Sequence, residues 1–201
     1  MRITAGIYRS RSLRAPAGTA TRPTSDRVRE ALFGTLSARN AVAGARVLDL
    51  YAGTGALGLE ALSRGAAHAT FVESSREALS ALRANVTALG LEGRTLVVAA
   101  VVERAVGRLA RRAPFDLVLA DPPWALVESG DAPGAVANLV GAGVLSPGAL
   151  LVLEHSSRTA APAMGGVVLE EERRYGDTAL AIYKPAILDP SRAPPARTAS
   201  E

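Results

Sequence analysis

The hydrophobic positions of the chain form short apolar runs that alternate with stretches in which apolar residues recur every three or four positions. Apolar runs predict strands of a parallel sheet covered on both faces, and the recurring positions predict helices. The predicted strands cover 46–50, 68–73, 94–98, 115–120 and 149–154, and the predicted helices cover about 56–64, 75–89, 101–111 and 133–142. This alternation is typical of an α/β fold around a mostly parallel sheet.

The amino-terminal part of the chain has a different pattern. Residues 1–23 are rich in Arg, Gly and Pro, which predicts a short extended or hairpin arm lying over the domain. Thr24-Ser25-Asp26 then supplies a helix N-cap, and apolar residues recur every fourth position from Val28 to Leu36. We therefore expect a helix that runs to about Ala38.

The carboxyl-terminal part predicts a closing antiparallel hairpin and a tail. Residues 167–172 and 178–183 bracket a Tyr-Gly-Asp turn, and the Pro-rich residues 185–201 predict a disordered segment. The expected organisation is a basic arm with its helix at 1–40, a core domain at 41–184 and the tail.

Composition narrows the functional classes. The 201 residues are 48% apolar, include no cysteine and only two histidines, and contain no uncharged apolar run long enough to span a membrane. Disulfides, thiolate metal sites and cysteine nucleophiles are excluded, and a histidine metal site is disfavoured. The first residues lack the apolar stretch of a secretory signal. We expect a metal-free cytoplasmic monomer with no membrane association.

The net charge of +4 hides an asymmetry along the chain. In residues 1–46, nine Arg against two acidic residues give +7, which leaves −3 for the remainder. A concentrated positive charge is typical of a nucleic-acid contact, and we expect Arg9, Arg11 and Arg14 to meet RNA phosphates. The alternative is an ordinary solvated basic face.

A glycine loop follows the first predicted strand. Residues 53–58 read Gly-Thr-Gly-Ala-Leu-Gly, and Glu73 ends the next strand. Glycines allow a ligand to approach the backbone closely, and a carboxylate at that strand end can accept hydrogen bonds from ribose hydroxyls. The loop alone fits a dinucleotide site equally well, but the pairing with Glu73 favours a nucleoside cofactor.

Asp49, just before this loop, favours S-adenosylmethionine over NAD. A carboxylate there can order the turn or approach the positively charged amino acid portion of that donor, whereas it would be poorly placed beside a pyrophosphate. A turn-capping aspartate is the alternative interpretation. The predicted donor site comprises Asp49, Tyr51, Ala52, Gly53, Gly55, Glu73 and Ser74.

The fourth predicted strand ends in Asp121-Pro122-Pro123-Trp124. To methylate an exocyclic amine, a site must hold it so that the nitrogen lone pair points at the methyl group. The Asp121 carboxylate and the Pro122 carbonyl can accept the two amine protons on a loop that the prolines stiffen, and Trp124 can stack on the base. We interpret these four residues as the catalytic loop; the alternative is a Pro-Pro turn with a capping aspartate.

Three segments resemble a known family. Residues 22–30, 48–65 and 121–124 are similar to the bacterial 16S rRNA guanine-N2 methyltransferases of the RsmD type, and the turn at 175–178 resembles the late turn of that family. The resemblance implies a class I, Rossmann-like S-adenosylmethionine-dependent fold with a seven-stranded sheet and a basic amino-terminal extension. It also implies a guanine target in small-subunit rRNA, within an assembled or assembling particle.

The resemblance also assigns residues. It implies that Gly53 and Gly55 lie against the methionine part of the donor, that Glu73 binds the ribose, and that three further residues edge the pocket or meet RNA. Those three are Arg22, Thr24 and Arg29. Two positions depart from the family pattern: Trp124 replaces the usual Phe or Tyr, and residues 98–101 lack the acidic or polar residue that commonly meets adenine.

Other functions compete with this interpretation. An adenine-N6 methyltransferase acting on DNA or RNA would use the same Asp-Pro-Pro-aromatic loop. A nicotinamide-dependent oxidoreductase would use the glycine loop, and a non-catalytic RNA-binding protein would use only the basic arm. Glu154 and His155, which end the fifth predicted strand, are interpreted as a capped strand end, with a role in the pocket as the alternative.

Overall fold

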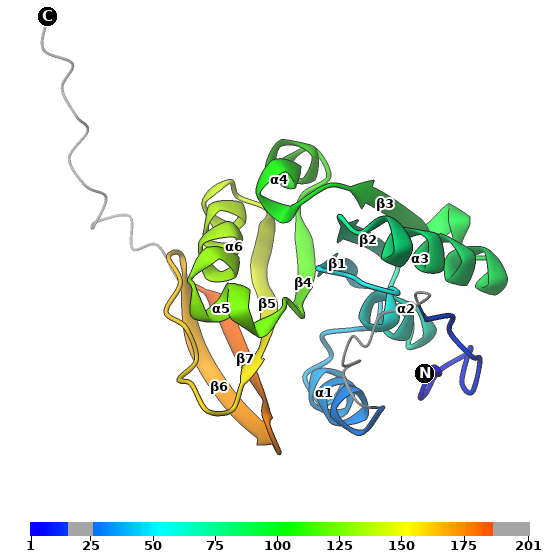
Figure 1. Cartoon of the computed structure of the whole chain (residues 1–201), viewed down its shortest axis with the longest axis horizontal. Helices are drawn as coiled ribbons and strands as arrows, with labels where there is room; N and C mark the ends of the chain where they lie inside the picture. Colours follow the sequence, from blue (N-terminus) through cyan, green and yellow to red (C-terminus); the bar gives the residue numbers. More distant parts are fainter. Residues whose placement is uncertain (16–25, 187–201) are drawn as a thin grey trace, which may run out of the picture.

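The computed structural model describes residues 1–15 and 26–186. One seven-stranded sheet has the order β3-β2-β1-β4-β5-β7-β6 (Figure 1). Strands β1 to β5 run parallel, and β7 is antiparallel to both of its neighbours. Their bounds are β1 (Arg46–Leu50), β2 (His68–Glu73), β3 (Thr95–Ala99), β4 (Phe115–Ala120), β5 (Leu145–Ser156), β6 (Val167–Tyr175) and β7 (Thr178–Pro185). The predicted mostly parallel sheet with a closing hairpin is confirmed.

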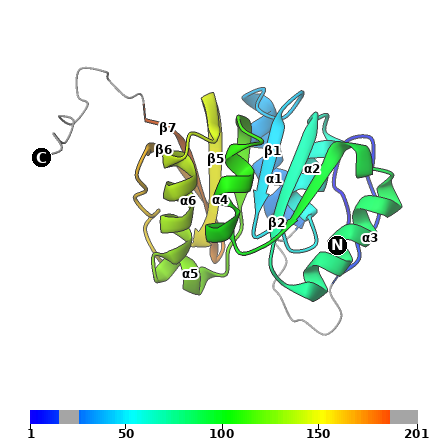
Figure 2. The same cartoon turned by 90° about the horizontal axis from the view of Figure 1, so that it is seen from above.

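Helices cover both faces of the sheet (Figures 1 and 2). One face packs against α1 (Asp26–Ala38), α2 (Ala56–Ser63) and α3 (Arg76–Leu89). The other packs against α4 (Val102–Ala110), α5 (Trp124–Glu128) and α6 (Asp131–Gly141). A 3-10 turn, η1 (Glu92–Arg94), precedes β3. Strand residues therefore alternate between two buried cores, which explains why the strands read as continuous apolar runs.

Two elements differ from the prediction. Helix α5 was not expected, because five residues after two prolines show no helical period. Strand β5 begins at Leu145, although Pro147 and Gly148 indicate a loop; it pairs there with Phe115 before a register shift in β4. The predicted tail at 185–201 begins too early, because Pro185 is the last residue of β7 and Ala186 N still donates to the Gly166 carbonyl. Residues 187–201 and the segment 16–25 lie outside the described residues. No helix in the described ranges is long and apolar enough to cross a membrane.

The amino-terminal arm, residues 1–15, folds back on itself over the domain. Arg2 and Ser12 form an isolated antiparallel bridge, and the Ile3 and Leu13 side chains are buried in the same core as α1, α2 and α3. The expected hairpin arm is confirmed for these residues. Burial of two aliphatic side chains, each worth about 1.5–3 kcal/mol, holds a segment that has little regular structure of its own.

A buried carboxylate anchors this arm to α2. Glu60 is fully buried and accepts hydrogen bonds from Thr4 N at 2.8 Å, Thr4 Oγ1 at 2.7 Å and Ala5 N at 3.0 Å. Arg64 Nε lies 2.8 Å from one carboxylate oxygen, and Arg29 Nε lies 3.4 Å from the other. The carboxylate therefore joins the arm, α1 and α2.

Arg29 is the cationic partner inside this cluster. Its side chain is fully buried, pairs with Asp26 at 2.9 Å and with Glu60, and donates to the Arg2 carbonyl. The expectation that Arg29 meets RNA or edges the pocket is wrong, because a side chain enclosed by α1, α2 and the arm has no surface to offer. Its basic character in the sequence reflects an internal ion pair.

Glu60→Ala is expected to lower the free energy of unfolding by about 3–5 kcal/mol, because it leaves the Arg29 charge buried without its carboxylate. Urea unfolding measures the change. Glu30→Ala, on the exposed face of α1, is the matched control and should change stability by no more than about 0.5 kcal/mol. Equal losses in the two variants would contradict a central role for Glu60.

Candidate active site at the carboxyl ends of the strands

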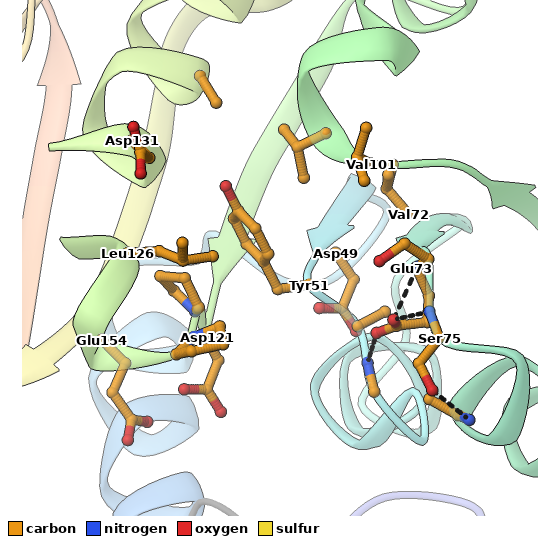
Figure 3. Close-up of a pocket in the computed structure, with 18 of the residues that line it drawn as sticks. Asp49, Tyr51, Val72, Glu73, Ser75, Val101, Asp121, Leu126, Asp131 and Glu154 are labelled. Atoms are coloured by element: carbon orange, nitrogen blue, oxygen red, sulfur yellow. Dashed lines mark hydrogen bonds between the residues drawn. The ribbon is translucent and has the colours of Figure 1, made fainter. Parts of the chain in front are cut away.

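A cavity of about 1260 Å³ opens at the carboxyl ends of the parallel strands (Figure 3). It is lined by residues that follow β1, β2, β3 and β4 and by the far end of β5. The strand order reverses between β1 and β4, which is the position where open α/β sheets bind ligands. The sequence prediction that the glycine loop (residues 53–58) and the Asp-Pro-Pro-Trp loop (residues 121–124) act together agrees with this placement, since both line the cavity.

The three glycines of the glycine loop have different reasons to be glycine. Gly53 has φ +55°, faces open space and lines the cavity. A Cβ on Gly55 would lie 2.4 Å from Leu82 Cδ1, and one on Gly58 would lie 2.4 Å from Phe71 Cε1. Gly55, expected to contact the donor, is outside the described cavity lining and instead allows α2 to pack closely on α3.

The two carboxylate oxygens of Asp49 have different environments. Oδ2 accepts a hydrogen bond from Gly58 N at 2.8 Å and so orders the turn into α2. Oδ1 is buried and has no hydrogen-bond partner among the described residues, although Asp49 lines the cavity. Burial raises the pKa of Asp49 well above its ordinary value, the Gly58 hydrogen bond opposes that rise, and the charges of Asp121 and Glu73 add to it.

Glu73 organises the loops around it. Its Oε2 accepts from Gly53 N at 2.7 Å, and its Oε1 accepts from Ser74 N and Ser75 N, each at 2.7 Å. A carboxylate has about four acceptor positions, so three backbone donors leave capacity for one further hydrogen bond. Glu73 therefore fixes the glycine loop against the start of α3 while still lining the cavity.

Tyr51 stands between the two halves of the cavity. Figure 3 shows its ring between Glu73 on one side and Asp121 on the other. The residue has φ +57°, a conformation that a bulky side chain rarely adopts. Its hydroxyl is buried without a described partner, and burial together with the charges of Glu103 and Asp131 raises its pKa to about 12. A neutral hydroxyl thus faces the cavity at all physiological pH values.

The Asp-Pro-Pro-Trp loop follows β4 directly. Asp121, Pro122, Pro123 and Trp124 all line the cavity, and Trp124 begins α5 with Pro123 as its N-cap. Ala52 and Ser74, both expected at the donor site, line it as well. The structure thus brings the predicted donor and amine residues to one cavity, Gly55 excepted, while their roles in binding stay predictions.

Some lining residues were not identified from the sequence. Glu103 in α4, Asp131 in α6 and Glu154 in β5 line the cavity. Glu103 and Asp131 sit in helices whose faces cannot be assigned to a cavity from periodicity alone. Glu154 ended a predicted strand beside the one that precedes Asp121, which was a usable signal. Of its two interpretations, the less favoured one, a place in the pocket, agrees with the structure.

Comparisons with known proteins identify the family. The family described as Conserved hypothetical protein 95 matches residues 1–184. The chain belongs to this family.

Relatives and solved structures agree with that membership. Ribosomal RNA small subunit methyltransferase D of Escherichia coli is 36% identical over 188 residues, covering 92% of this chain and 89% of that protein. Bacillus subtilis YlbH is 36% identical over 187 residues, covering 92% and 98%. The structure of Thermus thermophilus TTHA0928 superposes with a TM-score of 0.76 at 35% identity, covering 92% and 99%. The resemblance expected from the sequence is confirmed.

More distant structures share the fold alone. One of them, SMU.776, is 17% identical with a TM-score of 0.57 and was solved in complex with SAH. It covers 71% of this chain and 46% of that one. The class I arrangement of the sheet is therefore shared well beyond the family.

Apart from the buried Arg29, the residues predicted to contact RNA are either exposed or outside the described residues. Arg9, Arg11 and Arg14 are exposed on the arm, and Arg11 Nη2 donates to the Ala88 carbonyl at 3.0 Å. Arg22 and Thr24 lie outside the described residues. Contact of the three exposed arginines with RNA stays a prediction.

The cavity wall directly after β3 is apolar at its first positions. Ala100 and Val101 line the cavity, and Ala100 N donates to the Glu73 carbonyl at 2.9 Å. Glu103, in the first turn of α4, is the carboxylate that follows them in the lining. A ligand at this wall can therefore hydrogen-bond to backbone groups and to Glu103.

Asp49→Asn is expected to gain stability relative to the wild type as pH rises from about 4. Because the pKa of Asp49 is higher in the folded than in the unfolded protein, the folded wild type loses stability as pH rises from the unfolded to the folded pKa. Each unit of pKa difference corresponds to about 1.4 kcal/mol of unfolding free energy. The amide oxygen of Asn can still accept from Gly58 N.

Urea unfolding between pH 4 and pH 8 measures this difference. Glu30→Gln, an exposed carboxylate on α1, is the control and should show a nearly flat difference from the wild type. A gap between Asp49→Asn and wild type that does not change with pH would contradict the assignment of a raised pKa to Asp49.

Proposed function

We propose that the protein transfers the methyl group of S-adenosylmethionine to the exocyclic N2 amine of a guanine in small-subunit rRNA, within an assembled or assembling particle. The observation that carries this proposal is the single cavity shared by the glycine loop and the Asp-Pro-Pro-Trp loop. The name of the Escherichia coli relative, a ribosomal RNA small subunit methyltransferase, supports the substrate class.

The charge of the cavity favours this donor over a dinucleotide. The described lining residues carry six carboxylates and neither Arg nor Lys. S-adenosylmethionine is cationic at its sulfonium and its amino group, whereas a pyrophosphate would be repelled. When bound, the donor supplies an electrophilic methyl group. The buried Asp49 Oδ1 without a partner suits its amino group, and the remaining acceptor capacity of Glu73 suits a ribose hydroxyl.

The amine half of the cavity suits an aromatic amine. The Asp121 carboxylate and the Pro122 carbonyl can each accept one amine proton, which turns the nitrogen lone pair away from the ring and toward the donor half. Trp124 offers a face for stacking the base. Transfer would form the N–C bond as the S–C bond of the donor breaks, with that electron pair left on sulfur. The methylated nitrogen would then lose one proton, for which the Asp121 carboxylate is the acceptor beside it. We expect the positioning of the amine against the methyl group to account for most of the rate enhancement.

The cavity has room for both partners. About 1260 Å³ exceeds the roughly 300–1,000 Å³ typical of a pocket for one small ligand. A base turned out of the RNA can thus enter beside the donor, as enzymes that modify bases require.

The test uses labelled S-adenosylmethionine and small ribosomal subunits that lack their native methylations. After incubation with the protein, the rRNA is digested and the labelled nucleoside is identified. N2-methylguanosine is the expected product. N6-methyladenosine would keep the amine chemistry and overturn the proposed base, and the absence of label despite donor binding would overturn the proposed substrate.

Asp121→Ala is expected to lower turnover by about 100-fold or more, because one acceptor that orients the amine is lost. Donor affinity, measured by calorimetry, should persist because the donor half is intact. Glu128→Ala, at the exposed end of α5 and outside the lining, is the control and should retain turnover. Wild-type turnover in Asp121→Ala would contradict the proposed role.

A further inference from the structure

We propose that Glu154 makes this site selective for guanine, by accepting the N1–H of the base while Asp121 and Pro122 hold the neighbouring N2 amine. The inference rests on the proposed function of the cavity and goes beyond it by assigning the group that reads the base. Glu154 is thus a specificity residue, distinct from the residues that orient the amine.

Register places Glu154 beside Asp121. Strands β4 and β5 are parallel neighbours with Ala120 paired to Leu153, so Asp121 and Glu154 are the next residues along each strand. Neighbouring strands lie about 4.8 Å apart and paired residues point to the same face. Figure 3 shows the two carboxylates side by side, on the opposite side of Tyr51 from Glu73.

Glu154 faces the cavity and its neighbour does not. Glu154 lines the cavity although only 8% of the residue is exposed, which makes it a largely desolvated carboxylate at the amine end. His155, the next residue along β5, is fully buried outside the lining, and its Nδ1 contacts the Ser156 carbonyl. The alternation of the strand therefore directs the carboxylate, rather than the imidazole, into the cavity wall.

A carboxylate at the position of Glu154 can discriminate between bases by their hydrogen-bonding patterns. In guanine the ring nitrogen beside the amine carries a proton, so N1–H and the N2 amine are adjacent donors. In adenine and cytosine the ring nitrogen beside the amine carries a lone pair instead. An ionised carboxylate can only accept hydrogen bonds. Two adjacent carboxylates therefore match guanine, whereas Glu154 repels the ring nitrogen of either other base.

The other acidic residues of the cavity do not occupy this position. Asp131 lies beyond Leu126 from Asp121 in Figure 3, and Glu103 and Asp131 both act on the Tyr51 hydroxyl. Asp49 and Glu73 are engaged with the backbone of the glycine loop. Among the described lining residues, Glu154 is thus the carboxylate that β-sheet register brings next to Asp121.

The experiment compares guanine with 2-aminopurine, which keeps the amine on C2 but has a lone pair at N1. Each base is placed by ligation at the methylated position of small-subunit rRNA, which is then assembled with small-subunit proteins. We expect the wild type to prefer guanine in kcat/KM by roughly 10- to 100-fold. Glu154→Gln should reduce that ratio about tenfold or more, because its amide can donate to the N1 lone pair as well as accept from N1–H.

Controls separate specificity from structure. Glu128→Gln, exposed at the end of α5, should leave the ratio unchanged. Glu154→Asp keeps the carboxylate and should retain the preference for guanine with a lower kcat/KM, which provides a second measurement if the Gln variant does not fold. Thermal unfolding reports on folding of each variant.

The outcomes separate the role of Glu154 from the proposed function of the cavity. A ratio that Glu154→Gln leaves unchanged, or an equal loss on both bases, would overturn the role of Glu154 while the proposed function stands. Loss of the guanine preference in Glu154→Asp would also count against it. A wild-type protein that methylates neither base in this particle would overturn the proposed function itself.

Discussion

The buried carboxylate of Glu60 is the interaction on which the arrangement of the site depends. It is fully enclosed, accepts from two residues of the arm and pairs with Arg29 of α1 and with Arg64, the C-cap of α2. A buried charge is tolerated only when several groups compensate it, so the position of each partner is fixed by the others. Because α2 is the helix that the glycine loop opens, this cluster also sets where the loop meets the cavity.

Four carboxylates at the carboxyl ends of adjacent strands have different environments and hence different roles. Asp49 is buried in the cavity wall with one oxygen on Gly58 N, and Glu73 accepts from three backbone donors. Asp121 follows β4, and Glu154 lies near the carboxyl end of the neighbouring β5, at the other half of the cavity. The first two stabilise loops and leave one acceptor each for a ligand, whereas the last two form a paired acceptor surface. This division gives a cationic donor and an amine-bearing base separate binding groups in one acidic cavity.

Local patterns predicted much of the fold and part of the site. The apolar runs identified β1 to β5, and the Tyr-Gly-Asp turn identified the hairpin of β6 and β7. The glycine and Asp-Pro-Pro-Trp loops each follow one of the parallel strands, which predicted that they meet, because parallel strands end at one edge. Helix α5 has too few residues for a period, and the start of β5 contains Pro147 and Gly148.

The remaining errors came from tertiary partners that sequence does not reveal. Arg29 is basic like the exposed arginines before it, yet Glu60, 31 positions later, encloses it. Gly55 and Gly58 belong to a ligand-binding motif by spacing, but Gly55 has φ +80° and the Phe71 ring occupies the space that a Cβ on Gly58 would need. In both cases the residue type indicated that the position is special. Only the packing of the folded chain showed which groups surround it.

The arm is a wall of the donor half rather than a separate unit. Asn85 of α3, almost fully buried, accepts from Arg14 N at 2.7 Å and donates to the Arg14 carbonyl and to the Thr54 carbonyl at 3.0 Å. Thr54 belongs to the glycine loop and lines the cavity, as does Met1 of the arm. One buried amide thus joins the segment proposed to meet RNA with the loop proposed to hold the donor. Since a buried amide that loses a partner costs about 1–3 kcal/mol, the arm cannot shift without a penalty at the donor loop.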